Sequence, residues 1–160
     1  VVQLVRRGPN HRLEAQLFSL LADPDPAVVI PADPAELVAT QPEISALRID
    51  CFENGELDQA MQLGLVPLAW SPLGGGRIAG ADTPRDKAVI AELDRVAAAK
   101  GISRSVAAYS WLMAHPAGII PIIGSQQVER IAEGASALSV QWTRTDWYAV
   151  LVAARGERLP

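Results

Sequence analysis

The sequence predicts an α/β fold in which parallel strands are covered by helices. Short apolar runs typical of strands occur at residues 37–45, 66–70 and 119–123. The second and third runs are continuous rather than alternating, as in strands that are buried on both faces. Helical patterns separate the runs, and a helix between successive strands indicates a parallel crossover connection.

The amino-terminal part of the chain combines a predicted helix with a predicted loop. "RLEAQLFSLLA" at residues 12–22 contains good helix formers and places three leucines on one helical face. "DPDPAVVIPADPAE" at residues 23–36 contains four prolines and three aspartates, so we expect a surface loop inserted there. "VVQLV" at residues 1–5 is a candidate fourth strand.

Glycine, proline and short polar residues mark the ends of the remaining elements. Pro42 should weaken the pairing of the strand at residues 37–45 close to Gln41. Gly101 is placed to end one helix, and Ser103 is placed to cap the next. Thr143 and Asp146 have the spacing of a capping box for the last helix. Helices are predicted at residues 55–64, 84–101, 103–115, 128–138 and 145–156.

The number of strands limits the architecture to an open doubly wound sheet or part of a (β/α)8 barrel. A full barrel needs about 250 residues, whereas this chain has 160 residues and three or four strand patterns. We therefore expect one domain, residues 1–160, that forms about half a barrel. Such a fragment has unpaired strand edges and an uncovered inner face, so self-association through the open barrel edges is expected.

Composition excludes several classes of function. The net charge is −4 and no dense run of lysine and arginine is present, so we expect no nucleic-acid partner. The most apolar stretches are shorter than the roughly 20 residues that span a bilayer, so we expect no membrane partner. The lone Cys51 favours a reducing, cytoplasmic location and an inert thiol. No metal site is expected. His11 and His115 are expected to have structural roles, and His115 lies at a helix end, where a cation would interact favourably with the helix dipole.

Two glycine-containing loops are the main candidates for a binding site. Residues 71–76 follow one strand, and Gly124 with Ser125 follows the next. Both loops lie at carboxyl ends of parallel strands, where barrels and open sheets bind their ligands. Glycines allow backbone N–H groups to approach an anion, and Arg130 lies one turn into the helix that follows. The two loops could hold a diphosphate, although the first could also be only a flexible turn.

Three segments of the chain stand out, namely "VPLAWSPLGGGRIAG", "SRSVAAYSWLMAHPAGIIPIIGS" and "ERIAEGASALSVQWTRTDW". They resemble the carboxyl-terminal half of the aldo-keto reductase family, and the likeness runs from about Leu37 to Pro160. It implies a partial (β/α)8 TIM barrel, with roughly the last three or four strand–helix units, and the carboxyl-terminal half of the family's chain. It also implies NADP as cofactor, with NAD as the alternative, and a small carbonyl substrate if the complete barrel exists.

The resemblance assigns a role to each candidate cofactor-binding residue. Trp70 matches the aromatic that stacks on the nicotinamide, and Gln41 matches the glutamine that holds its carboxamide. The loop residues match groups that wrap the pyrophosphate, and the second loop and its helix match the groups at the 2′-phosphate and adenine. The full set is Gln41, Trp70, Ser71, Leu73, Gly75, Gly124, Ser125, Arg130 and Glu133.

The resemblance also implies what this chain does not supply. The family's catalytic tyrosine, lysine, aspartate and histidine lie in its first half, so we expect no catalytic residue here. Tyr109 and Tyr148 are expected to pack within helices, as are Trp111, Trp142 and Trp147, and Gly134 replaces a common asparagine.

Three functions remain open at this point. The first is an NAD(P)H-dependent oxidoreductase that reduces a small aldehyde or ketone by hydride transfer, with this chain as the cofactor-binding half. The second is a truncated, catalytically inactive relative that binds dinucleotides weakly or acts as a protein-interaction module. The third is an unrelated phosphate-binding α/β protein.

Overall fold

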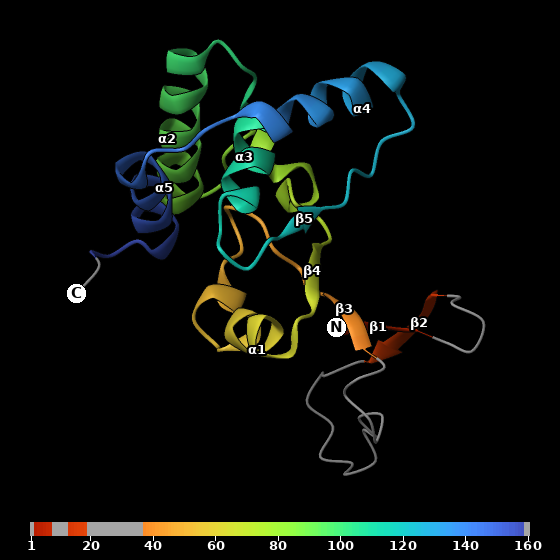
Figure 1. Cartoon of the computed structure of the whole chain (residues 1–160). Coiled ribbons are helices and arrows are strands. Elements are labelled where there is room, and N and C mark those ends of the chain that lie inside the picture. Colours follow the sequence, from red (N-terminus) through yellow and green to blue (C-terminus); the bar gives the residue numbers. More distant parts are fainter. Residues whose placement is uncertain (1, 8–12, 19–36, 159–160) are drawn as a thin grey trace.

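A computed structural model describes residues 2–7, 13–18 and 37–158 of the chain. Its sheet has five strands in the order β2-β1-β3-β4-β5 (Figure 1). The parallel part consists of β3 (Leu37–Gln41), β4 (Val66–Ala69) and β5 (Ile120–Pro121). An antiparallel hairpin of β1 (Val2–Arg7) and β2 (Leu13–Phe18) extends the sheet, and β1 is antiparallel to β3. The predicted α/β architecture is confirmed.

The predicted helix over residues 12–22 is wrong in its described part. Residues 13–18 form β2 and pair with β1 along its whole length. The sequence "LEAQLF" also alternates apolar and polar residues in its first five positions, and a short helix without packing partners is only marginally stable. The candidate strand at residues 1–5 is confirmed as β1, but it is antiparallel to β3 and so begins no parallel unit. The predicted loop at residues 23–36 and His11 lie outside the described residues.

The helices form where the capping signals predict them. The structure contains α1 (Glu56–Leu63), α2 (Pro84–Lys100), α3 (Arg104–Met113), α4 (Val128–Ala135) and α5 (Arg144–Arg155). Three short 3-10 turns are η3 (Asp50–Phe52), η4 (Gly74–Ala79) and η5 (Ser136–Ser139). The Ser103 hydroxyl accepts a hydrogen bond from the Val106 N–H at 3.2 Å, and Thr143 accepts one from the Asp146 N–H at 3.1 Å. Gly101 ends α2 in the left-handed conformation.

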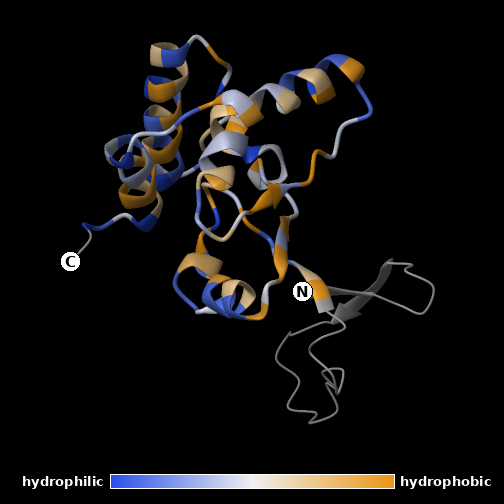
Figure 2. Ribbon diagram, viewed as in Figure 1, coloured by the Kyte–Doolittle hydropathy of each residue, from blue (hydrophilic) through white to orange (hydrophobic). Residues whose placement is uncertain are grey.

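One face of the parallel strands is buried and the other is open. Along β4, Pro67 and Ala69 are buried, whereas Val66 is 38% exposed. Ile120 on β5 is 52% exposed. In Figure 2 the ribbon has hydrophobic colours along β4 and β5, the two strands to which the exposed Val66 and Ile120 belong. The expectation that these strands are buried on both faces is wrong for this chain, whereas the expected uncovered inner face is present.

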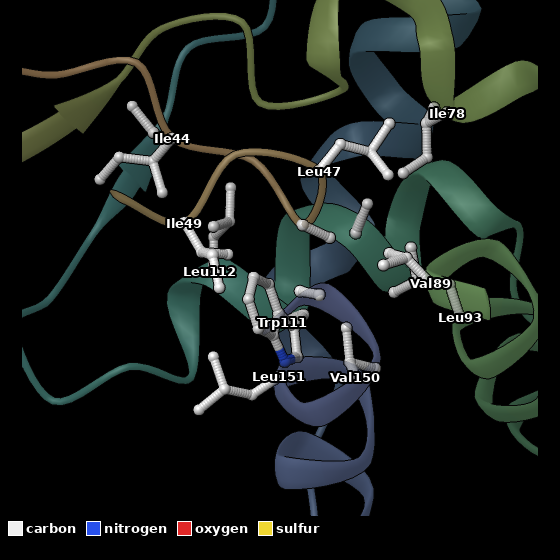
Figure 3. Packing of buried hydrophobic residues seen from close by; sticks show 14 of the residues in the cluster. Ile44, Leu47, Ile49, Ile78, Val89, Leu93, Trp111, Leu112, Val150 and Leu151 are labelled. Atoms are coloured by element: carbon white, nitrogen blue, oxygen red, sulfur yellow. The ribbon is translucent and has the colours of Figure 1, made fainter. Parts of the chain in front are cut away.

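The core lies where α2 packs against α3 and α5, and Trp111 is its largest fully buried side chain (Figure 3). The Trp111 indole N–H donates to the Trp147 carbonyl at 3.0 Å, and the Trp147 indole N–H donates to the Trp111 carbonyl at 2.9 Å. The two rings stack with centroids 5.4 Å apart. This reciprocal pair satisfies both polar groups inside the core, so α3 and α5 are held at one relative position.

His115 has a structural role, but it is not a cation at the end of α3. The Ala117 N–H donates to its Nδ1 at 3.1 Å, and the Phe52 ring packs edge-on with centroids 4.8 Å apart. Burial lowers the pKa of His115, which favours the neutral ring. Desolvation and the hydrogen bond from the Ala117 N–H, which requires an unprotonated Nδ1, both oppose the cation expected at this helix end.

Three further features of the described part of the chain concern the thiol, the possible metal ligands and the length of the helices. Burial, followed by the charge of Glu56, raises the pKa of the Cys51 thiol to about 12, which favours the protonated thiol over the reactive thiolate. No group of His, Cys, Asp and Glu among the described residues is arranged to hold a metal ion. None of the described helices has both the length and the apolar character that a bilayer crossing requires.

Trp111→Phe should lower the free energy of unfolding by about 3 kcal/mol, because it leaves a cavity and removes the hydrogen bond from the Trp111 indole N–H to the Trp147 carbonyl. Trp142→Phe is the matched control, since Trp142 is half-buried and donates one hydrogen bond to Ser110. It should cost only about 1 kcal/mol. Urea unfolding of both variants measures the difference, and equal losses would contradict the role of the reciprocal pair.

His115→Asn should reduce the acid sensitivity of the fold, because Asn can accept the Ala117 hydrogen bond without titrating. A lowered folded pKa means that the stability contributed by neutral His115 is complete above its unfolded value of about 6.5 and is lost as the pH falls below that value. Urea unfolding at about pH 8 and pH 5.5 measures the loss. The variant should lose less stability on acidification than the wild-type chain. An equal loss would refute the assignment.

Candidate functional site

The first glycine loop begins at the end of β4 with a sharp reversal of the chain. Ser71 adopts a positive φ of 52°, and the Gly74 N–H donates to the Ser71 carbonyl at 2.7 Å. Gly74 has a φ of +61°, and a Cβ there would lie 3.2 Å from the Leu47 side chain. Glycine is required at this position both by the backbone and by the close packing of the loop.

Parallel pairing brings the second loop beside the first. Leu68 pairs with Ile120, and Ala69 pairs with Pro121. The Ile122 N–H continues the ladder by donating to the Ala69 carbonyl at 2.9 Å. Because β4 and β5 run in the same direction, the loops that follow them leave the sheet at the same edge.

Between the two loops lies a cleft of about 600 Å³. Its walls come from the end of β4, the η4 loop, the end of β5 and the first turns of α4. Most of the predicted cofactor-binding residues line it, namely Ser71, Leu73, Gly75, Gly124, Ser125, Arg130 and Glu133. Residues separated by more than 50 positions in the sequence therefore share one cavity.

Helix α3 forms a further wall, which the sequence reasoning missed. Ser105 and Tyr109 both line the cleft. Tyr109 is only 8% exposed, and burial and the nearby charge of Glu133 raise the pKa of its hydroxyl. These two residues are four positions apart and therefore lie on one helical face, which is the signal that could have placed them together.

The cleft contains one positive group, Arg130, and one negative group, Glu133. Arg130 is exposed, and among the described residues no carboxylate lies within ion-pair distance of its guanidinium. The Ser125 hydroxyl accepts a hydrogen bond from the Gln127 N–H at 3.2 Å and thereby holds the entry to α4. A guanidinium beside hydroxyl groups and a glycine loop can bind a phosphate.

Gln41 and Trp70 are not part of the cleft wall, but they lie on neighbouring strand ends. The Trp70 N–H donates to the Pro42 carbonyl at 3.0 Å, and Trp70 forms a parallel bridge with Glu43. Trp70 is 37% exposed, so its ring is available to a ligand. The structure therefore brings Gln41 and Trp70 to the same edge of the sheet as the two loops.

Gly134 is a buried residue of α4, next to the cleft residues Ile123 and Tyr109. A Cβ there would clash with Cδ1 of Ile123 and lie 3.5 Å from the Tyr109 ring. An asparagine at this position would require Ile123 to move.

Comparison with known proteins decides the family. The model of the aldo/keto reductase family matches residues 28–151. The chain belongs to the aldo/keto reductase family. Two 6-dehydroglucose reductases are similar to this aldo/keto reductase chain. The protein from Novosphingobium aromaticivorans is 78% identical over 125 residues, which are 78% of this chain and 41% of that protein. The protein from Agrobacterium fabrum is 37% identical over 124 residues, which are 77% of this chain and 40% of that protein.

A solved structure supports the fold assignment. A thermostable aldo-keto reductase, crystallised with the inhibitor epalrestat, superposes with a TM-score of 0.60 at 19% identity. The match covers 71% of this chain and 38% of that one. This aldo/keto reductase chain therefore has the fold of part of the family's barrel, and it spans about two fifths of the length of the curated relatives it matches.

Gly74→Ala should destabilise the first loop by about 2–3 kcal/mol, because a Cβ would add steric contact to an unfavourable positive φ. Gly55→Ala is the matched control, since Gly55 has a φ of +84° and no atom within 4 Å of its Cβ position. It should cost only about 1 kcal/mol. Urea unfolding compares the two variants, and a Gly74→Ala loss no larger than the control would show that the loop is not tightly packed.

Proposed function

We propose that this chain is the cofactor-binding half of an NAD(P)H-dependent aldo-keto reductase. The observation that carries the proposal is the shared cleft, in which the loop after β4 and the loop after β5 meet beside Arg130. Neither loop alone would be a specific signal. Their convergence at the carboxyl edge of the parallel strands supplies a place for both ends of an extended dinucleotide.

The residues of the cleft are compatible with a bound dinucleotide. A Cβ at Gly76 would meet no atom within 4 Å, and one at Gly75 would meet only the Ser71 hydroxyl at 3.8 Å. The loop thus leaves open space on the cleft side, where backbone groups can approach a pyrophosphate. The volume of about 600 Å³ lies in the range of small-molecule sites.

The residues of the chain divide into binding and orienting groups. Ser71, Leu73 and Gly75 would surround the pyrophosphate, while Trp70 and Gln41 at the strand ends would orient the nicotinamide. When bound, the nicotinamide supplies the hydride that reduces a carbonyl carbon. An exposed indole plane can fix which face of a stacked ring is turned towards the substrate. Protonation of the carbonyl oxygen is assigned to the part of the complete protein that precedes this chain.

Arg130 and Ser125 favour NADP over NAD, with NAD as the alternative. A guanidinium fork binds a phosphate with two hydrogen bonds, and the cofactor's 2′-phosphate is the group that distinguishes the two dinucleotides. Glu133 lines the same part of the cleft and could accept a hydrogen bond from the adenine amine. The buried, unpaired Cys51 is consistent with a cytoplasmic location, which we also propose.

The substrate we propose is a small sugar aldehyde of the 6-dehydroglucose type. Support comes from the name of the relative that is 78% identical. The reduction belongs to the complete protein, because the aligned region is only 41% of that relative.

A second candidate function follows from the open inner face of the sheet. Val66 and Ile120 expose apolar surface that monomeric proteins usually cover. If the chain acts without an amino-terminal half, this face and the open strand edges would favour self-association or an interaction module without catalysis. Neither candidate function involves a nucleic acid or a membrane.

Titration of the chain with NADPH tests both candidates. We expect saturable quenching of tryptophan fluorescence, most of which should disappear in Trp70→Ala if that ring stacks on the nicotinamide. Arg130→Met should weaken NADPH binding by about tenfold or more and change NADH binding little, because only NADPH carries the 2′-phosphate. Arg144→Met is the matched control, since Arg144 lies over the Tyr148 ring at 5.5 Å, outside the cleft. Absence of binding at millimolar NADPH would favour the interaction module.

A further inference from the structure

The η4 loop is held from its outer side by two arginines that do not line the cleft. Ile78 and Ala79 at the end of the loop contribute to the cleft wall, whereas Arg77 and Arg104 do not. Both guanidinium groups bind backbone carbonyls of the loop. They could therefore control its conformation without touching a ligand.

Arg104, the first residue of α3, joins three parts of the chain. Its Nε and Nη2 donate to the two carboxylate oxygens of Asp94 on α2, both at 2.6 Å. Its Nη1 donates to the Ile78 carbonyl at 2.9 Å and to the Ala79 carbonyl at 3.4 Å. The planar fork fits the carboxylate with two bonds and leaves a third donor for the loop, a geometry that lysine cannot reproduce.

Arg77 fixes the start of the same loop. Its Nε donates to the Gly74 carbonyl at 3.2 Å, and its Nη1 lies 3.5 Å from Oδ2 of the buried Asp86. No cis peptide bond occurs in the described chain, and in a trans peptide the C=O and the following N–H point in opposite directions. The Gly75 N–H therefore points away from the Arg77 guanidinium.

We propose that Arg104 is a positioning residue that keeps the η4 loop in the conformation required for binding the pyrophosphate. This inference rests on the proposed dinucleotide function. The loop contains three consecutive glycines, which have more conformational freedom than other residues and would lose it on binding. A loop that is ordered before the ligand arrives does not incur that entropic cost at the moment of binding.

Arg104 and Arg130 differ in whether their positive charge is paired with a carboxylate. Asp94 forms a bidentate ion pair with Arg104, whereas among the described residues Arg130 has no carboxylate within ion-pair distance. Loss of Arg130 should therefore reduce the salt dependence of NADPH binding, because it removes an unpaired charge at the site. Loss of Arg104 should weaken binding without changing that salt dependence.

The test compares Arg104→Met with Arg95→Met in the 160-residue chain. Arg95 is a matched control because, like Arg104, it donates two hydrogen bonds to carboxylate oxygens, here of Glu92 at 2.9 Å and Asp146 at 2.8 Å, and neither partner belongs to the loop. Calorimetric titration measures the affinity for NADPH and for adenosine 2′-monophosphate. The monophosphate lacks the pyrophosphate and nicotinamide, so it reports only on the end of the cleft near Arg130. Arg104→Met should weaken NADPH binding about tenfold and adenosine 2′-monophosphate binding less than about twofold. Arg95→Met should change neither.

Arg104→Lys provides a second variant that retains the charge. It should weaken NADPH binding by an intermediate amount, because an ammonium group cannot bind Asp94 through a planar fork while holding the loop. It also keeps the test decisive if Arg104→Met does not fold. Equal NADPH affinity in wild type and both Arg104 variants would overturn the inference. An equal loss for NADPH and adenosine 2′-monophosphate would also overturn it, because that pattern indicates general damage to the fold.

Hydrogen exchange in the ligand-free chain tests the inference independently of the proposed function. The amides of residues 74–79 should exchange about tenfold faster in Arg104→Met than in wild type, with Arg95→Met unchanged. If wild type does not bind NADPH, the proposed function fails while the exchange rates still decide whether Arg104 orders the loop. Unchanged exchange in Arg104→Met would refute the positioning role even if NADPH binds.

Discussion

The parallel pairing of β4 with β5 is the constraint on which the candidate site depends. It involves only Leu68 with Ile120, Ala69 with Pro121, and one further bond from Ile122. Parallel strands cannot be joined by a tight turn, so the chain between them must form α2 and α3 before returning to the sheet. The crossover therefore builds the core and aligns the two loops in the same step.

Helix α3 connects the site to the rest of the molecule. Its first turns carry Arg104, which binds the loop carbonyls, and Tyr109, which forms a wall of the cleft. Its last turns carry Trp111, which is bonded to Trp147 on α5. A shift of this helix would move the cleft wall and the loop anchor together. Core packing and site geometry are thus coupled through one rigid element rather than through separate supports.

Local chemistry made the helices predictable, and competition between local and distant interactions explains the errors. The caps at Ser103 and Thr143 depend on residues three positions away, so a single sequence contains the whole signal. The segment at residues 13–18 has both helical and alternating patterns, and pairing with β1 selects the strand. Burial makes His115 neutral despite its place at a helix end, and desolvation depends on distant rings that the local sequence does not reveal.

The sequence by itself determined the order of strands and helices from residue 37 onward, the caps, the glycine loops and about half of the residues that line the cleft, because these rest on local patterns and on family resemblance. Only the tertiary structure decided which of these residues share the cleft, that α3 contributes Ser105 and Tyr109, and that Arg104 holds the loop. The physical reason is separation along the chain. Arg104 and the Ile78 carbonyl are 26 residues apart, and only the α2–α3 crossover brings them within hydrogen-bond distance.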